Sequence, residues 1–435
     1  MLEGGAPGVK REPRPRRASR RLQAAGNDAV EPGATAAVFA VLIRRAIDSV
    51  ASSRFRARVP AVDAGGLGPF LDKGLAGVAE NVVAGERLSF AEGALLATTS
   101  DLLGVGRLAN FVRERLHGNA TFFNVNRHLN PTNVCVASCA LCAFAEKYGG
   151  TRGWTYTVEE AVEVAARDVT GDVTELHIVG GLHPKLGVEY YEALFAALSA
   201  RFPWVHLKAL TMVEIDFLAQ RAKLPVEEVV RRLAAAGLGS CPGGGAEIFA
   251  ERVRAVICDH KTSGERWLEI ARAVHGLGVK SNCTMLYGHI ETAEERVDHL
   301  VRLCELQDAT GGFQCFIPLA FHPANTRLDH VAPSTGRLDL QTVALSRLML
   351  DNIPHVKAYW IMLGAKAAQI ALHFGADDLD GTVVDERITL AAGGEAGAGM
   401  ARADLEHLIR EAQRVPVERD TLYRPVAAAP LAAAG

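Results

Sequence analysis

The sequence predicts an α/β fold, an eight-fold (β/α) barrel with an N-terminal helical cap. From about residue 118 onward, short apolar runs alternate with amphipathic stretches, and repeated strand–helix units of this kind form a parallel sheet. Polar or glycine-rich segments follow one apolar run after another. Because the active site of such a barrel lies in the loops at the carboxyl ends of its strands, these segments favour a barrel with a site at that end.

The expected strands are short runs of apolar and β-branched residues. They lie at 175–179, 206–211, 279–286, 312–319 and 356–362. Helical periodicity predicts the intervening helices at 158–168, 188–201, 226–236, 264–276, 293–310, 338–352 and 365–374. The segments around Trp360 and at 377–382 supply the seventh and eighth strands.

The chain divides into five regions. Residues 1–35 are rich in arginine and lack apolar periodicity, so they cannot bury enough surface to offset the entropy of ordering. We expect a disordered basic arm there; a nucleic-acid-binding arm and a transit peptide are the alternatives. Residues 36–117 form a helical region whose part 70–117 caps the barrel. The other regions are the barrel core at 118–389, an Ala/Gly-rich loop at 390–400, and a C-terminal helix and tail at 401–425 that complete the barrel.

Composition narrows the class of protein. The chain has 435 residues, 49% of them hydrophobic, and a formal net charge of -3. That charge gives no reason to expect nucleic acid or an anionic membrane as a partner, and no apolar run approaches the ~20 residues that span a bilayer. Reduced cysteines and the lack of an export signal predict a cytoplasmic protein.

Three cysteines on one short segment form the strongest motif. Cys135, Cys139 and Cys142 are spaced C-x3-C-x2-C, which suits a cubane iron–sulfur cluster whose fourth iron has no protein ligand. Structural zinc would need a fourth Cys or His, but the other five cysteines are scattered and His128 does not have a usual ligand spacing. A disulfide framework is disfavoured in so long a chain. We therefore predict a 4Fe–4S cluster.

Further candidate residues follow other predicted strands. Gly180 and Gly181 come directly after one strand, where a missing Cβ lets the backbone approach a ligand. Glu214 is a carboxylate expected at the end of the next strand, and Tyr287-Gly288 follows 279–286.

Two side chains are candidates for contact with the substrate. His183 follows the glycine pair and could donate a proton. Arg327 could pair with a carboxylate in a forked geometry. The backbone amides of Gly243–Gly245 could also cradle an anion.

The cysteine motif resembles that of the radical S-adenosylmethionine (SAM) superfamily, with Leu141 at a position that is often aromatic there. The resemblance implies a TIM-like barrel and a 4Fe–4S cluster that holds SAM. By the same resemblance, Gly180 and Gly181 approach the methionine amino group. It also places Glu214 at the ribose hydroxyls and Tyr287 and Gly288 beside the adenosyl group.

Four separated segments narrow the resemblance from the superfamily to one of its families. Residues 177–185, 284–289, 357–364 and 416–423 are similar to those of the aminodeoxyfutalosine synthase family of the futalosine route to menaquinone, and the likeness covers about residues 70–423. It implies a transferase that adds the 5′-deoxyadenosyl radical to 3-[(1-carboxyvinyl)oxy]benzoate. Aryl migration and loss of bicarbonate would then give 6-amino-6-deoxyfutalosine and methionine.

The resemblance also implies a low-potential electron donor such as flavodoxin or ferredoxin. Two alternatives stay open. One is a related radical SAM enzyme, either dehypoxanthine futalosine cyclase or an FO synthase subunit. The other is a non-catalytic metal-binding barrel.

Overall fold

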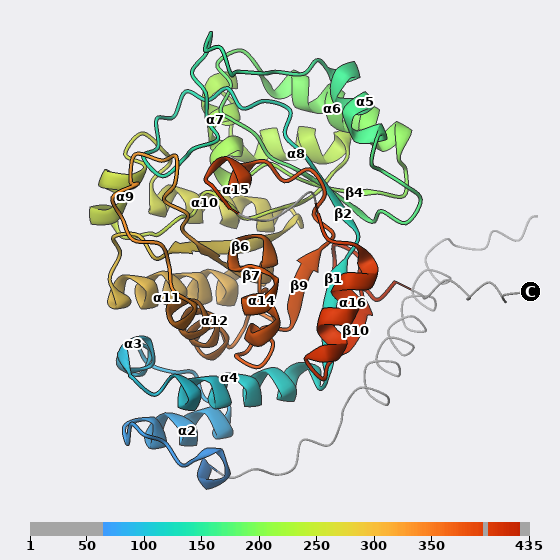
Figure 1. Ribbon diagram of the computed structural model, residues 1–435. Helices are drawn as coiled ribbons and strands as arrows, with labels where there is room; N and C mark the ends of the chain where they lie inside the picture. Colours follow the sequence, from blue (N-terminus) through green and yellow to red (C-terminus); the bar gives the residue numbers. More distant parts are fainter. Residues whose placement is uncertain (1–63, 395–398, 427–435) are drawn as a thin grey trace, which may run out of the picture. The chain divides into compact units, whose positions relative to one another are not determined.

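The computed structural model describes residues 64–394 and 399–426 (Figure 1). The predicted basic arm at 1–35 lies outside these residues. So do residues 36–63 of the predicted helical region and part of the predicted loop at 390–400.

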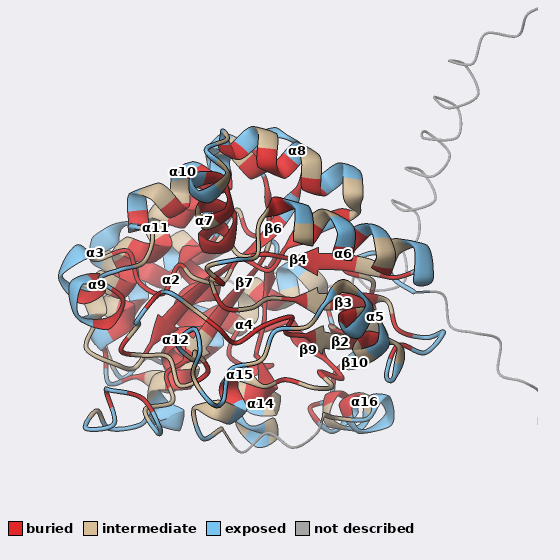
Figure 2. Ribbon diagram, turned by 90° about the horizontal axis from the view of Figure 1, so that it is seen from above, coloured by how far each residue is buried: buried red, intermediate tan, exposed pale blue. Residues whose placement is uncertain are grey.

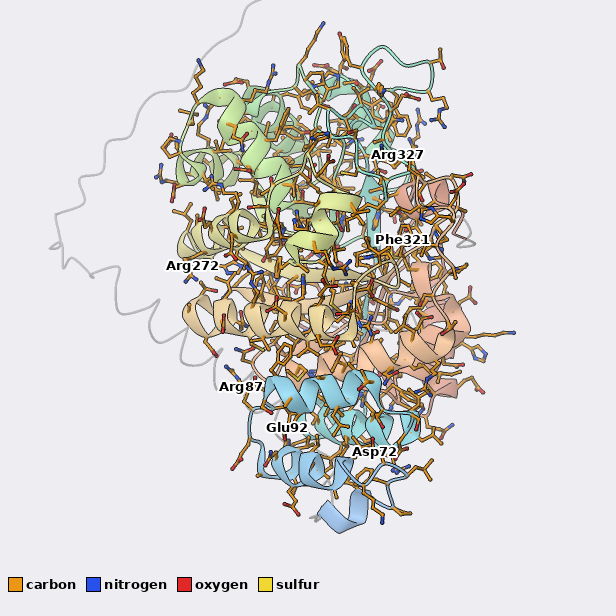
Figure 3. The ribbon with its side chains drawn as sticks, turned by 90° about the vertical axis from the view of Figure 1, so that its left-hand side faces the viewer. Asp72, Arg87, Glu92, Arg272, Phe321 and Arg327 are labelled. Atoms are coloured by element: carbon orange, nitrogen blue, oxygen red, sulfur yellow. The ribbon has the colours of Figure 1, made fainter. Side chains whose placement is uncertain are left out.

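Helices between residues 64 and 117 form the cap. They are the 3-10 helix η1 (Ala64–Leu67) and the α-helices α2 (Leu75–Ala84), α3 (Phe90–Thr98) and α4 (Leu102–His117). The side chain of Asp101 accepts a hydrogen bond from Gly104 N at 2.8 Å and so begins α4. Helix α4 packs on α12 (Gly336–Met349). In the side view, Asp72, Arg87 and Glu92 lie at one end of the described chain, and Arg327 lies toward the other (Figure 3).

Seven parallel strands lie side by side in chain order. They are β2 (Asn126–Leu129), β3 (Glu175–Ile178), β4 (His206–Ala209), β5 (Leu238–Cys241), β6 (Lys280–Tyr287), β7 (Phe313–Ala320) and β8 (His355–Val356). The predicted strands at 175–179, 206–211, 279–286 and 312–319 correspond to β3, β4, β6 and β7.

Strand β9 (Asp378–Gly381) belongs to a separate three-stranded sheet, of order β10-β1-β9, that lies beside the β8 edge. Two backbone hydrogen bonds join the start of β9 to the end of β8. Asp377 N donates to Val356 O at 3.0 Å, and Ala358 N donates to Asp378 O at 2.8 Å. On its other side β9 pairs with β1 (Ala120–Asn124), which runs directly into β2. Strand β10 (Val415–Glu418) pairs with the remaining edge of β1. The predicted α/β barrel with its helical cap is confirmed as a curled sheet of seven parallel strands, with the smaller sheet of β10, β1 and β9 beside it.

The remaining helices follow the strands, and most of them cover the outside of the barrel. They are α5 (Val158–Ala166), α6 (Val188–Arg201), α7 (Met212–Ala222), α8 (Val226–Ala236), α9 (Glu251–Ile257), α10 (Gly264–Gly276), α11 (Ala293–Thr310), α13 (Trp360–Leu363), α14 (Ala365–Ala371), α15 (Ile388–Ala391) and α16 (Arg402–Glu411). Figure 2 shows buried strands and helices such as α8 and α10 with an exposed outer face.

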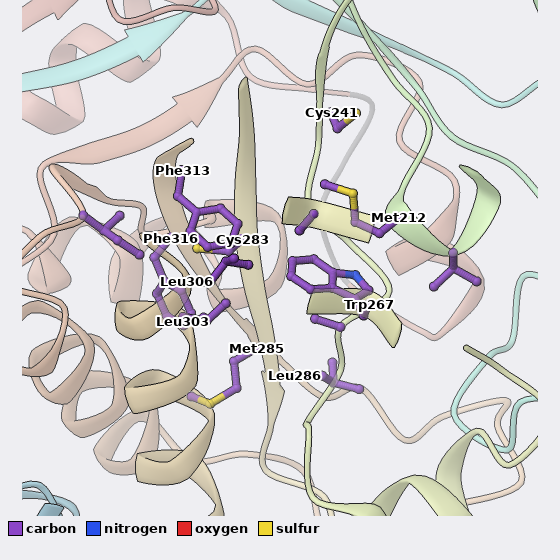
Figure 4. Close-up of a cluster of buried hydrophobic side chains, with 14 of the residues drawn as sticks. Met212, Cys241, Trp267, Cys283, Met285, Leu286, Leu303, Leu306, Phe313 and Phe316 are labelled. Carbon is purple, nitrogen blue, oxygen red and sulfur yellow. The ribbon is translucent and has the colours of Figure 1, made fainter. Parts of the chain in front are cut away.

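The core fills the space between these helices and the strands. Trp267 of α10 is fully buried and stacks on Phe313 of β7, with ring centroids 6.3 Å apart. Cys283 of β6 and Leu303 of α11 belong to the same cluster (Figure 4). Burial of these apolar side chains stabilises the fold by about 25 cal/mol per Å², and it fixes the strand ends that carry the site.

Two sequence-based expectations are wrong in detail. Of the predicted strand 356–362, only its start is paired, and Trp360–Leu363 forms the short helix α13. A short apolar run does not distinguish a strand from a buried helical turn. Glu214 does not end a strand either: β4 stops at Ala209, and Thr211 and Glu214 form the capping box of α7.

Candidate active site

A cavity of about 320 Å³ is lined by residues at and beyond the carboxyl ends of the strands. Six residues predicted from the sequence line it together: Cys135, Cys139, Cys142, Gly180, Gly181 and Glu214. The barrel therefore brings together segments that follow β2, β3 and β4.

The cysteine loop is held in place by backbone hydrogen bonds. Cys135 N donates to Glu146 O at 2.9 Å, and Val136 N donates to Leu182 O at 3.0 Å. Ala140 N donates to Ile257 O at 2.8 Å. The loop thus rests on the segment after β3 and on the end of α9.

The three motif cysteines differ from the rest. They are partly exposed and line the cavity, whereas the other five described cysteines are buried and do not line it. Burial raises the pKa of the Cys135 thiol, and it raises the pKa of Cys139 to about 12. A bound metal would be needed to make these groups thiolates at neutral pH. Three thiols of one loop facing one cavity fit the predicted cluster.

The glycine edge, residues Gly180 and Gly181, packs directly on the cysteine loop. Gly181 N donates to Thr132 O at 2.9 Å. A Cβ at Gly181 would lie 2.3 Å from Val134 O, and one at Gly180 would lie 2.9 Å from Thr132 O. Because these neighbours are backbone atoms, only glycine fits without displacing the loop.

Glu214 holds the glycine edge from the other side. Its Oε1 accepts a hydrogen bond from Gly180 N at 2.9 Å, and its Oε2 accepts one from Thr211 N at 2.7 Å. Burial raises the pKa of Glu214 to about 7 in spite of these hydrogen bonds, which lower it. Both carboxylate oxygens thus contact backbone, so the predicted contact with ribose hydroxyls would be an additional one.

Below the glycine edge lies a group of polar side chains that are not among the predicted site residues. Lys208 Nζ lies 2.7 Å from Glu175 Oε2, and Lys357 Nζ donates to Asp380 Oδ1 at 2.6 Å. The rings of His128 and His177 stack with centroids 4.5 Å apart. We call these six residues the polar floor; all except Glu175 line the cavity. In β3 and β4, their signal in the sequence is a charged or polar residue at alternate positions.

A second ion pair lies near the cysteines. Lys261 Nζ pairs with Glu247 Oε1, and both residues line the cavity. Burial dominates the raised pKa of Cys139, and the Lys261 ammonium counteracts it. Lys261 therefore favours the thiolate form of this cysteine. Gly244 and Gly245 of the predicted anion cradle also line the cavity.

Four predicted site residues do not line this cavity. The hydroxyl of Tyr287 donates to Asp339 Oδ1 at 2.8 Å, and Gly288 N donates to Glu291 Oε1 at 2.8 Å. His183 lines a separate small cavity of about 10 Å³, and its Nδ1 accepts a hydrogen bond from Lys185 N at 3.1 Å. Arg327 is exposed, and its guanidinium donates to Ser138 O of the cysteine loop. Their roles toward SAM and substrate stay predictions.

The fold and the cysteine-lined cavity define the class of the radical SAM enzymes. The family model described as "Radical SAM superfamily" matches residues 129–303. The model "CofH/MqnC C-terminal region" matches residues 310–430.

Curated relatives narrow the class. The chain is 47% identical to "Aminodeoxyfutalosine synthase" of Thermus thermophilus over 82% of this chain and 96% of the relative. It is 46% identical to the protein of that name in Streptomyces coelicolor, over 79% and 92%. It is 39% identical to "Cyclic dehypoxanthine futalosine synthase" of Streptomyces coelicolor, over 80% and 87%. The chain belongs to the family of the aminodeoxyfutalosine synthases.

Solved structures support the fold alone. The FeFe-hydrogenase maturase HydG of Carboxydothermus hydrogenoformans superimposes with a TM-score of 0.63 at 16% identity, over 81% of each chain. Methylornithine synthase (PylB) gives a TM-score of 0.60 at 15% identity, over 78% of this chain and 96% of that chain. Within residues 64–394 and 399–426, no helix is long and apolar enough to cross a membrane.

Proposed function

We propose that this chain acts as an aminodeoxyfutalosine synthase. It would transfer the 5′-deoxyadenosyl group of SAM to 3-[(1-carboxyvinyl)oxy]benzoate, with aryl migration and loss of bicarbonate, to give 6-amino-6-deoxyfutalosine and methionine. The observation that carries the proposal is the cavity in which Cys135, Cys139 and Cys142 face the glycine edge. The identity of 47% over 96% of a synthase of that name supports it.

Cys135, Cys139 and Cys142 would hold a 4Fe–4S cluster. When bound, this group supplies an electron to SAM and, at its open iron, a site for the methionine part of SAM. A low-potential donor such as flavodoxin or ferredoxin would renew the electron.

The protein's own residues position the reactants. The glycine edge gives SAM a surface without side chains, and Glu214 fixes that edge through Gly180 N. The apolar side chains Leu286, Ile317 and Leu319 line the cavity. They exclude water and so protect reactive species from side reactions.

A product assay tests the proposal. Reduced, anaerobically reconstituted protein is incubated with SAM and the enolpyruvyl benzoate, and products are identified by liquid chromatography and mass spectrometry. We expect 6-amino-6-deoxyfutalosine and methionine in equal amounts. Turnover of dehypoxanthine futalosine without this product would assign the chain to the cyclase. Purification with zinc, or without iron after reconstitution, would favour a non-catalytic barrel.

A further inference from the structure

The polar floor carries more hydrogen-bond donors than its own residues use. Lys208 and Lys357 are only 3% and 1% exposed and both line the cavity. An ammonium group has three donors, and each of these has one partner among the described residues, Glu175 or Asp380. Each lysine therefore keeps two N–H groups for a bound molecule. A buried donor without a partner is costly.

The two histidines of the floor offer further hydrogen-bonding groups to a bound molecule. Burial lowers the pKa of His128 and of His177, which keeps both imidazoles neutral. The fully buried Nε2 of His128 has no hydrogen-bond partner among the described residues. A neutral imidazole offers one N–H donor and one acceptor, so the stacked pair can donate to a ligand from one face of the cavity.

The strand register places these groups in one row. His128 on β2 pairs with His177 on β3, which pairs with Lys208 on β4. His177 lies three residues before Gly180, so the row is about 10 Å deeper in the barrel at 3.3 Å per residue. The span from the enol ether double bond of the substrate to its ring carboxylate, together with a hydrogen bond of about 3 Å to the floor, is comparable with this depth.

We propose that the polar floor binds the ring carboxylate of the benzoate substrate, an inference that rests on the proposed function. The enol ether then faces the glycine edge and the cysteine loop, where the adenosyl group is delivered. The charge of Lys208 is balanced by Glu175, and the charge of Lys357 is balanced by Asp380. The carboxylate is thus held by the unused N–H donors of the lysines and histidines, not by a net positive field. Ile317 and Tyr359, which also line the cavity, offer apolar surface to the ring.

The test compares two substrates that differ only in this carboxylate. They are 3-[(1-carboxyvinyl)oxy]benzoate and its unsubstituted phenyl counterpart, 2-phenoxyacrylate. The variant Lys357→Met with Asp380→Asn removes one ion pair as a unit, because a single change would leave an unpaired buried charge. Asp380 has a φ of 73°, a conformation that asparagine tolerates. Lys208→Met with Glu175→Gln is the second variant, in case the first does not fold. Lys280→Met, an exposed lysine outside the cavity, is the matched control.

For the wild type and the control we expect kcat/KM to favour the carboxylated substrate by about 10-fold to 100-fold, the effect of losing charged hydrogen bonds. In a floor variant that folds and binds iron, we expect the ratio of the two kcat/KM values to fall to about one. The change should come from a higher KM for the carboxylated substrate, and the dissociation constant of SAM should be unchanged. If the wild type forms the product and the floor variants keep the preference for the carboxylated substrate, this inference is wrong and the proposed function stands. Loss of SAM binding in those variants would assign the floor to SAM and overturn it as well. Wild-type protein that forms no aminodeoxyfutalosine overturns the proposed function and, with it, this inference.

Discussion

The backbone N–H of Gly180 donates a hydrogen bond to Oε1 of Glu214 at 2.9 Å. The same carboxylate caps helix α7 through Thr211 N. One buried side chain therefore connects the end of β3, the start of α7 and the wall of the cavity. The position of the glycine edge against the cysteine loop depends on this contact.

We expect Glu214→Gln to remove a pH-dependent contribution to stability. Burial raises the pKa of Glu214 from 4.5 to about 7. Between these values the folded protein holds a proton that the unfolded chain lacks, so the wild type loses stability as pH rises, by at most about 1.4 kcal/mol per pH unit. The variant lacks this slope, and at pH 5, where the wild-type carboxyl is protonated and also offers one carbonyl oxygen, its stability should be close to that of the wild type. Urea unfolding at pH 5, 6 and 7 measures both effects.

Glu92→Gln is the matched control, because Glu92 holds the same capping-box position in α3, outside the cavity. Burial raises the pKa of Glu92, but hydrogen bonds from Ser89 and Asn81 outweigh it and hold the pKa below its usual value. Its replacement should therefore leave the slope between pH 5 and 7 intact. Equal slopes for the wild type and Glu214→Gln would contradict the role assigned to Glu214.

Gly181→Ala should separate the glycine edge from the cysteine loop. The new Cβ would lie 2.3 Å from Val134 O, and a backbone atom cannot rotate away. We expect a loss of several kcal/mol of stability and a lower iron content after reconstitution. Gly77→Ala in α2 is the control, because no atom lies within 4 Å of its Cβ and alanine stabilises a helix by about 1 kcal/mol relative to glycine. A Gly181→Ala protein with normal stability and iron would refute the close packing.

Cys135→Ala, Cys139→Ala and Cys142→Ala should each abolish the brown colour and SAM cleavage. The wild type should hold about four iron atoms per chain. Cys283→Ala, a change at a buried cysteine away from the cavity, should keep both properties. Iron analysis and methionine release measure the outcome. Colour and cleavage that persist in all three motif variants would exclude the cluster assignment.

Asp377→Asn should destabilise the contact between the cap and the barrel without affecting the cluster. The Asp377 carboxylate pairs with buried Arg347, accepts from Val356 N at 2.8 Å and lies 3.5 Å from His117 of α4. Removing its charge leaves Arg347 buried and unpaired, at a cost of about 3–5 kcal/mol. Unfolding in urea should show this loss, with iron content unchanged.

Glu406→Gln provides the control for the Asp377 variant. It breaks the pairs with Arg402 and Arg410 on the surface of α16 and should cost less than about 1 kcal/mol. Iron loss in the Asp377→Asn protein at normal stability would contradict the separation of this ion pair from the cavity.

Local patterns were enough to predict much of this protein. Cysteine spacing predicted the candidate cluster motif, because residues on one loop are held near one another by chain connectivity alone. Periodicity identified most helices and strands, and the order of polar segments after the strands predicted where the cavity forms. The prediction of a strand around Trp360 is wrong, because a short apolar segment has no distinguishing period.

The tertiary structure alone decided which polar residues meet. Glu175 and His177 lie on β3 and Lys208 lies on β4. Only the register of the parallel strands and the contacts between them place these residues beside His128, Lys357 and Asp380. The tertiary structure also pairs the Tyr287 hydroxyl with Asp339, and in it Arg327 lies outside the cavity. The sequence by itself predicted the barrel and the three cysteines as candidate ligands, because both predictions rest on short-range spacing. The depth and chemistry of the cavity depend on contacts between segments tens to hundreds of residues apart.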